Sequence, residues 1–200
     1  MELQVTRPFV VSSPEQLETI ASPGREEVID AVALIGPCRV SELARQLGHS
    51  RHALYYHVKA LRDCGLLVET RRTVAGARET CFYDVPGRPV SVRFDLSTPA
   101  RRRAVTALSR ARLQKGSKGV ARACASHATV TEGPRRELWA THVKGWLSGA
   151  DLEEMNRLFL CLVDVISRAS NSQSTGRKAF ELTFALSPVR RKARRVPPNN

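Results

Sequence analysis

The chain has 200 residues, of which 42% are apolar, so it can bury a core as one ordinary domain or two small ones. Its 32 Lys and Arg against 19 Asp and Glu give a net charge of +13, which favours a polyanionic partner, nucleic acid first and an acidic membrane surface second. The longest apolar run (residues 158–163) is far shorter than the roughly 18 residues of a membrane helix, and the five scattered cysteines contain no CxxC pair, which excludes a membrane-spanning protein, a collagen and a disulfide scaffold.

The first part of the chain predicts an arm followed by three helices. Residues 1–19, with their Ser-Ser-Pro turn, indicate a partly ordered N-terminal arm. Ser22 before Pro23 is typical of a helix start, in which serine caps the helix and proline takes the first helical position. Ser41 and Ser50 are the expected caps of the second and third helices. The helices themselves are predicted over residues 23–35, 41–47 and 50–64.

A hairpin is predicted directly after the third helix. Residues 66–70 and 80–85 have the composition of strands, and Gly76 allows a turn in the connection RRTVAGAR. The order of three helices, a tight turn between the second and third, and a hairpin is that of a winged helix-turn-helix. We place this DNA-binding domain at residues 20–96.

The second half of the chain is expected to combine helix and strand in a dimerisation or sensing region at residues 97–187. Residues 97–125 predict a basic helix with eight Lys and Arg and no acid, weakened at its centre by Gly116 and Gly119. The stretch ELWATHVKGWLS is of uncertain type, with a strand as one reading. A capping box of Ser148 and Asp151 opens a long helix. The alternation of residues 180–186 then predicts a half-buried strand.

The segment VSELARQLGHSRHALYYHVKALRDCGLL carries the strongest functional signal. Apolar residues at positions 43, 47, 54, 58 and 61 give two helices a shared core, and Gly48 permits the turn between them. The outer face of the second helix is left with basic and aromatic side chains suited to a major groove. This set consists of Arg51, His52, Tyr55, Tyr56 and Lys59.

These residue types predict a division of roles on DNA. Residues near the N-terminus of a recognition helix reach base edges, so the first four of the set are expected to read sequence. Ser41 and Ser50, at helix starts, are expected to bind phosphates together with adjacent backbone N–H groups. The hairpin would reach the DNA backbone or minor groove with Arg71, Arg72 and Arg78.

This segment resembles the ArsR-like winged helix-turn-helix regulators of bacteria. The resemblance rests on SELARQLGHSRHALYYHVKALRDCGLL, with its ELA…LG turn and its Leu-Arg…Gly-Leu-Leu before the wing, and covers about residues 20–86. GWLSGADLEEMNRLFLCLVDVI is similar to a C-terminal helical region of some of these proteins. The resemblance and the predicted elements together indicate an α+β, mainly helical fold with a C-terminal helical and strand region. The resemblance also implies a homodimeric transcription factor, usually a repressor that a ligand or metal releases.

The cysteines depart from the metal-sensing members of that group. Those proteins place cysteines in the first helix of the motif, where this chain has VSELARQL. Cys124 and His127 would supply two ligands, but a metal site needs three or four. We therefore expect neither a metal nor a cofactor. His57 is interpreted either as a positioned residue that contacts backbone or as a pH sensor.

The basic run and the aromatic residues of the second half each allow more than one interpretation. The basic run at 97–125 is a solvated helix face, a surface packed on a partner subunit with Leu108 and Leu113 inward, or an added grip on the DNA backbone. Four aromatic residues build a second small core or line a pocket for an unidentified small-molecule effector. They are Trp139, Trp146, Phe180 and Phe184.

Together these patterns predict a sequence-specific regulator of transcription that binds double-stranded DNA as a dimeric repressor. We expect it in the bacterial cytoplasm, on the nucleoid when bound, and without enzymatic activity, because the sequence has no phosphate-binding glycine loop and no HExxH. A basic disordered tail at residues 188–200 would strengthen non-specific binding; its RRKARR would be a nuclear localisation signal in a eukaryotic chain. The alternative is a protein-interaction or architectural module that binds nucleic acid without specificity.

Overall fold

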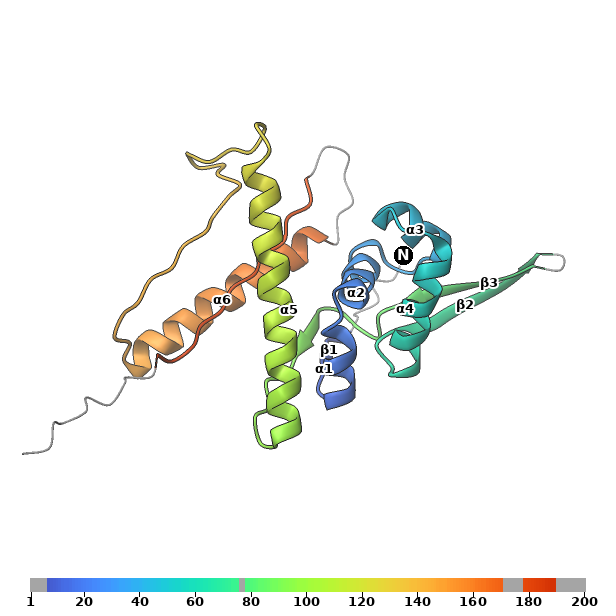
Figure 1. The fold of residues 1–200 in the computed structure, drawn as a ribbon, viewed down its shortest axis with the longest axis horizontal. Coiled ribbons are helices and arrows are strands. Elements are labelled where there is room, and N and C mark those ends of the chain that lie inside the picture. Colours follow the sequence, from blue (N-terminus) through green and yellow to red (C-terminus); the bar gives the residue numbers. More distant parts are fainter. Residues whose placement is uncertain (1–6, 76–77, 171–177, 190–200) are drawn as a thin grey trace, which may run out of the picture.

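The computed structural model describes residues 7–75, 78–170 and 178–189 and has the predicted α+β, mainly helical fold (Figure 1). The elements up to the hairpin and the short strand after it are β1 (Phe9–Val11), α1 (Pro14–Ile20), α2 (Pro23–Ile35), α3 (Val40–Leu47), α4 (Arg51–Asp63), β2 (Val68–Ala75), β3 (Arg78–Asp84) and β4 (Val90–Val92). Two long helices follow, α5 (Pro99–Cys124) and α6 (Gly149–Ser170).

Helices α3 and α4 form the predicted helix-turn-helix. Gly48 ends α3 with a φ of 68°, a left-handed conformation that glycine adopts without strain. Ser50 caps α4, since its Oγ accepts a hydrogen bond of 3.3 Å from the N–H of Ala53. Apolar side chains of both helices are buried in one core, which confirms the predicted packing: Leu43, Leu54, Val58 and Leu61.

Helix α3 begins one residue earlier than predicted. Its N-cap is Arg39, whose backbone N–H donates a hydrogen bond of 2.7 Å to the carboxylate of Glu42. The prediction that Ser41 caps this helix is therefore wrong, because Ser41 lies in the first helical turn. The error follows from the general preference for serine at helix starts, which the Glu42 hydrogen bond overrides here.

Strands β2 and β3 form the predicted hairpin, which is longer than expected. Antiparallel pairing runs from Val68 with Asp84 to Ala75 with Arg78. Residues 66 and 67, which the prediction included in the first strand, precede β2 and are buried in the core instead. The hairpin projects away from the helices, as Figure 1 shows.

The first elements pack onto the domain, which differs from the arm predicted over residues 1–19. Strand β1 pairs in parallel with β4. Ser13 caps α1, with its Oγ accepting a hydrogen bond of 3.1 Å from the N–H of Gln16. The apolar side chains of this segment are part of the core, which is why it does not extend into solvent: Val11, Leu17 and Ile20. The division of the chain into domains stays a prediction.

Helix α5 is docked on the N-terminal half by an apolar patch and by ion pairs. Ala104, Val105 and Leu108 are buried, and α5 packs along α1 (Figure 1). Farther along, Arg112 Nε lies 2.7 Å from Glu26 Oε1 on α2. Burial of the Lys115 ammonium would lower its pKa, but the hydrogen bond and charge of Asp30 outweigh this and raise the pKa. The basic helix is therefore tied to α1 and α2.

The two glycines of α5 do not interrupt the helix, contrary to the weakening that we predicted. A Cβ built on Gly116 would lie 2.9 Å from the Cβ of Thr183, and one on Gly119 would collide with the carboxylate of Glu181. Glycine at these two positions allows the C-terminal segment to cross α5 at close range.

Helix α6 begins with the predicted capping box. The N–H of Ser148 donates a hydrogen bond of 2.7 Å to the Asp151 carboxylate, and the N–H of Asp151 donates one of 3.2 Å to Ser148 Oγ. On its apolar face, Phe159 stacks on Phe184 with ring centroids 4.3 Å apart. Most of the other apolar side chains of α6 are exposed.

Within the described residues, the strand predicted over residues 180–186 is not formed, nor is a strand at 137–148, which was one reading of that stretch. Residues 137–148 and 180–186 belong to no sheet. A strand needs a neighbour for its N–H and C=O groups, and this part of the chain offers none. The predicted second core is absent as well, because its aromatic residues are exposed: Trp139 70%, Trp146 85%, Phe180 57% and Phe184 45%.

A search of the described helices finds none with the length and apolar character needed to cross a membrane.

Candidate nucleic-acid interface

The outer face of α4 presents the side chains that the sequence predicts as DNA contacts. Leu54, Val58 and Leu61 are buried, so the opposite side of this thirteen-residue helix points outward. Such a helix is about 20 Å long, which suits a major groove. All five predicted residues are exposed: Arg51, His52, Tyr55, Tyr56 and Lys59. Their contact with DNA stays a prediction.

The two tyrosines of α4 have different surroundings. The guanidinium of Arg25, on α2, lies 5.8 Å from the ring centroid of Tyr56. The ring of His57 lies edge-on to Tyr56 at the same centroid distance, 5.8 Å. Tyr55 has no ring or cation contact within the described residues. The sequence analysis missed Arg25, because the neighbourhood of Tyr56 depends on how α2 crosses α4.

His57 packs against the start of α2. A Cβ built on Gly24 would lie 3.0 Å from Nε2 of His57, so glycine allows the ring to approach the backbone. The Nδ1 atom of His57 is buried and has no hydrogen-bond partner in the described part of the chain. Nearby, His49 Nε2 lies 3.3 Å from a carboxylate oxygen of Glu27 and links the turn of the motif to α2. Contacts with α2 thus fix the position of α4.

The two predicted phosphate-binding serines lie at the starts of α3 and α4. Ser41 is exposed in the first turn of α3, and Ser50 is exposed at the N-cap of α4. A helix N-terminus carries partial positive charge and free N–H groups, which favour anions. The start of α4, which has no acid in its first turn, offers an electrostatically suitable position for a phosphate, whereas at α3 the Glu42 carboxylate already occupies the N-cap N–H.

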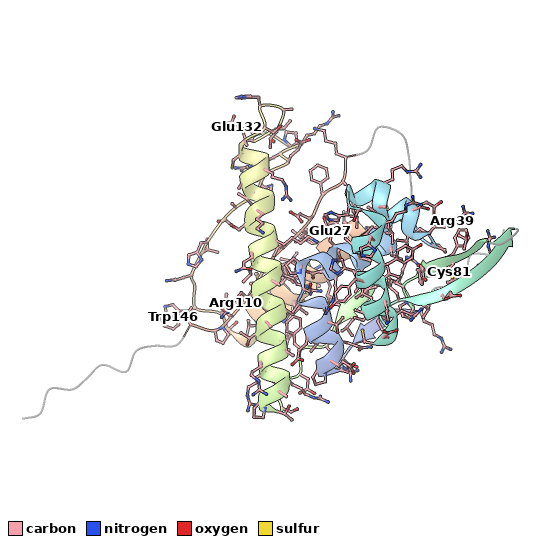
Figure 2. All side chains as sticks on the ribbon, turned by 45° about the vertical axis from the view of Figure 1, so that its right-hand side comes forward. Glu27, Arg39, Cys81, Arg110, Glu132 and Trp146 are labelled. Carbon is pink, nitrogen blue, oxygen red and sulfur yellow. The ribbon has the colours of Figure 1, made fainter. Side chains whose placement is uncertain are left out.

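The base of the hairpin holds a cluster that the sequence analysis missed in part. The guanidinium of Arg71 lies 4.6 Å from the ring centroid of Phe82, and that of Arg39 lies 4.7 Å from the same centroid. Figure 2 shows Arg39 beside the hairpin. Arg72 and Arg78 lie in β2 and β3, and their side chains are outside the described part of the structure. The contact between Arg39 and Phe82 depends on the register of β3 and on the early start of α3, neither of which the sequence predicts.

The basic face of α5 lies apart from this surface. Arg110 and its neighbours Arg102 and Arg103 are exposed. Helix α5 and the hairpin lie on opposite sides of α1 and α2 (Figure 1), and Arg110 points away from the hairpin region in Figure 2. Leu108 is buried in its own chain, so of the two leucines only Leu113 is exposed to a partner subunit. The role of this basic face stays a prediction.

The thiols and histidines form no metal centre in the part of the chain that the structure describes, where no group of three or more ligand side chains is placed to hold an ion. Cys124 and His127 are both exposed. Burial, followed by the negative charges of Glu42 and Asp84, raises the pKa of the Cys38 thiol to about 12. Cys38 is therefore a neutral core residue at physiological pH.

Comparison with known families gives one match. Residues 22–68 match the model of a family described as bacterial regulatory protein, arsR family. The matched segment runs from the N-cap of α2 to the first residue of β2, so it contains the whole helix-turn-helix. A comparison with curated proteins finds no match.

Proposed function

Because residues 22–68 form a helix-turn-helix domain of the arsR family of bacterial regulatory proteins, we propose that this DNA-binding transcription regulator recognises a specific duplex sequence with α4. The observation that carries the proposal is the outward face of α4, on which every predicted contact residue is exposed. An aromatic and basic face of this length matches the width and the polar edges of a major groove.

On DNA, the side chains divide into readers and anchors. Arg51, at the start of α4, reaches a base edge and pairs with guanine through two hydrogen bonds, while Tyr55 contacts a thymine methyl group. The anchors bind phosphate and set the register of α4 in the groove. They are Ser41, Ser50, Lys59, Arg71, Arg72 and Arg78, and the remaining readers are His52 and Tyr56.

The protein acts as a homodimer, with a second copy covering the apolar surface of the C-terminal region. Its four exposed aromatic residues alone present roughly 500 Å², taking about 200 Å² for each side chain. Helix α6 adds further exposed apolar side chains, and a stable interface needs about 800 Å² on each partner. These α6 residues are Leu152, Leu158, Leu162, Val163 and Val165.

Charge favours this surface over others for contact between identical copies. The chain as a whole carries +13, and α5 contributes much of it. Residues 137–189 hold six acids and five bases, so two copies meeting there do not bring the strongly basic surfaces together. A two-fold dimer would place its two recognition helices about one DNA turn, ~34 Å, apart.

The regulator works in the bacterial cytoplasm, on the nucleoid, by occupying DNA rather than by catalysis. Repression is the direction that we propose, from the resemblance of the helix-turn-helix segment alone. Release by a small-molecule effector stays a prediction, and no metal or cofactor takes part in the proposed mechanism.

The deciding experiment is selection of bound sequences from a random duplex pool at a stated salt concentration. We expect an enriched sequence with two-fold symmetry, bound at least 1,000-fold (~10³) more tightly than a scrambled duplex of the same length. Equal affinity for the selected and scrambled duplexes would contradict sequence-specific regulation. That result would favour the alternative, a protein-interaction or architectural module whose basic segments bind nucleic acid loosely.

A further inference from the structure

Two arginines from different elements stack on one aromatic ring at the base of the hairpin. Arg39 is the N-cap of α3, Arg71 belongs to β2, and Phe82 belongs to β3. The guanidinium carbons lie 4.7 Å and 4.6 Å from the ring centroid, well within the roughly 6 Å over which a cation is attracted to an aromatic face. The ring therefore holds two positive charges within about 10 Å of each other on an exposed surface.

Both charges are available to a ligand. Arg39 and Arg71 are exposed, and neither has an ion-pair partner among the residues that the structure describes. A guanidinium that lies face to face on a ring keeps the N–H groups at its edge free to donate. The guanidinium edge fits the oxygens of a phosphate in a bidentate manner. Phe82 thus orients the guanidinium groups of Arg39 and Arg71 and leaves their N–H groups free to bind a ligand.

The cluster joins two elements next to α4 that are expected to approach the DNA backbone. In a helix-turn-helix, the first helix crosses the DNA backbone, and Arg39 is the N-cap of α3, the first helix of the motif. Arg71 lies in the wing, which starts from the other end of α4. The ring of Phe82 connects these two anchoring elements, so a backbone that passes one arginine also passes the other.

We propose that Arg39 and Arg71 bind the DNA phosphate backbone as one clamp and that Phe82 is its positioning residue. The inference rests on the proposed function, because it places the duplex on α4. It adds an anchor, Arg39, and a positioning residue, Phe82, to the predicted contact set. Since phosphates carry no sequence information, the clamp contributes affinity and register rather than selectivity.

The first test measures the salt dependence of binding for Arg39→Ala. The duplexes are the one selected from the random pool and a scrambled duplex of equal length. Loss of one phosphate contact lowers the slope of log affinity against log salt by about 0.9, so between ~50 and ~200 mM salt the wild type should weaken about 3-fold more than the variant. The affinity of the variant at low salt should fall roughly tenfold on both duplexes alike.

Arg110→Ala is the matched control, because it removes the same charge from the exposed face of α5, away from the hairpin (Figure 2). Its salt slope should equal that of the wild type. An unchanged slope for Arg39→Ala, or equal slope changes in both variants, would overturn the clamp.

The second test concerns Phe82, which is half-buried, so each variant is first checked for an unchanged unfolding midpoint. Phe82→Leu keeps an apolar side chain but removes the aromatic face, whereas Phe82→Tyr keeps that face. We expect Phe82→Leu to weaken binding by about 3-fold, Phe82→Tyr to bind as the wild type, and Arg39→Ala to lose part of its effect in the Leu background. Equal affinities of the Leu and Tyr variants, or strictly additive effects with Arg39→Ala, would show that Phe82 has no positioning role.

The outcomes separate this inference from the proposed function. If the wild type binds selected and scrambled duplexes equally but Arg39→Ala still lowers the salt slope, sequence-specific regulation is wrong and the clamp stands. If the wild type prefers the selected duplex and Arg39→Ala changes nothing, the clamp is wrong and the proposed function stands.

Discussion

The neighbouring side chains Tyr55 and Tyr56 on α4 differ in their surroundings, so we expect them to contact DNA in different ways. The ring of Tyr56 lies beside Arg25 and His57, which restrict its movement on one side, while the residue stays 66% exposed. Tyr55 points outward without such support among the described residues. We therefore expect Tyr56 to act as a fixed part of the surface and Tyr55 to adjust to the base that it meets. Arg51, one turn earlier, shares the outward face of Tyr55.

Arg51→Ala should separate reading from anchoring. Loss of a bidentate contact with guanine should cost about 1–3 kcal/mol at the selected site and relax the preference at one base position. Arg62→Ala is a control on the same helix, because Arg62 lies in its last turn, 3.0 Å from Asp63. The measurement is the affinity for the selected duplex and for its single-base variants. A uniform loss on every duplex would assign Arg51 to a phosphate instead.

Cys38 should react with alkylating reagents more slowly than the exposed cysteines. Because burial raises its pKa to about 12, the nucleophilic thiolate is scarce at pH 8. Alkylation of the native protein, followed by mass spectrometry, should modify the exposed Cys124 and Cys161 first and Cys38 only on unfolding. The same shift means that the contribution of Cys38 to stability is complete below pH ~8.5 and is lost as the pH rises toward 12. Rapid labelling of native Cys38 would contradict its burial.

At the scale of elements, the sequence predicts the features that depend on residues close together in the chain. Glycine and serine mark the ends of α2, α3 and α4 within a residue or two, and the apolar spacing of α3 and α4 identifies their shared core. Strand β1 could not be predicted, because its three residues pair with β4, about 80 positions later. The same holds for the Arg39 and Phe82 contact, which depends on where β3 lies against α3. Long-range pairing leaves no periodic pattern in the sequence.

Helix α5 should detach partly when the Glu26 and Arg112 pair is broken. Glu26 is 6% exposed, and its Oε2 has no hydrogen-bond partner in the described structure. Arg112→Leu leaves this carboxylate buried and unpaired, so it should lower the free energy of unfolding by about 1–3 kcal/mol, below the usual range because Arg112 is partly exposed. Chemical denaturation measures the effect. The double variant Glu26→Leu and Arg112→Leu should recover part of the loss, and additive losses would argue against the pair.

At the scale of the whole molecule, the N-terminal half and α5 hold the core while the C-terminal half remains open. The buried apolar residues of the described chain lie between positions 11 and 108. The sequence predicts α6 and its cap correctly, because both are local features. It also predicts a strand at 180–186 and allows one at 137–148, but a local pattern cannot supply the pairing partner that a strand needs. A second copy would supply one.

Leu162→Glu should convert a dimer into a monomer. Leu162 lies on the exposed apolar face of α6, and a charge there opposes burial against another copy. Arg157→Glu is the control, since Arg157 is exposed on the side of the helix away from the apolar residues assigned to the interface. Sedimentation at micromolar concentration should give dimers for the wild type and Arg157→Glu and monomers for Leu162→Glu. A monomeric wild type would contradict the proposed dimer.

Deletion of residues 190–195, which lie outside the described residues, should weaken binding to all duplexes alike. This segment carries five Lys and Arg, whose attraction to phosphate does not depend on sequence. The deletion should flatten the salt slope and leave the ratio of selected to scrambled affinity unchanged. Titrations at several salt concentrations measure both quantities. A changed ratio would mean that the tail takes part in recognition.

The pairing of the first elements with late ones constrains how the chain emerges from the ribosome. Strand β1 and helix α1 leave the exit tunnel early, but their partners include the late elements β4 and α5. In a nascent chain, part of the apolar surface around Val11, Leu17 and Ile20 therefore stays exposed to water until β4 and α5 have emerged, after the recognition helix can form. Translation that stops after the hairpin would release a fragment with a complete DNA-binding face. The apolar side chains that normally pack on β4 and α5 would be exposed in it, so we expect the fragment to have a short cellular lifetime.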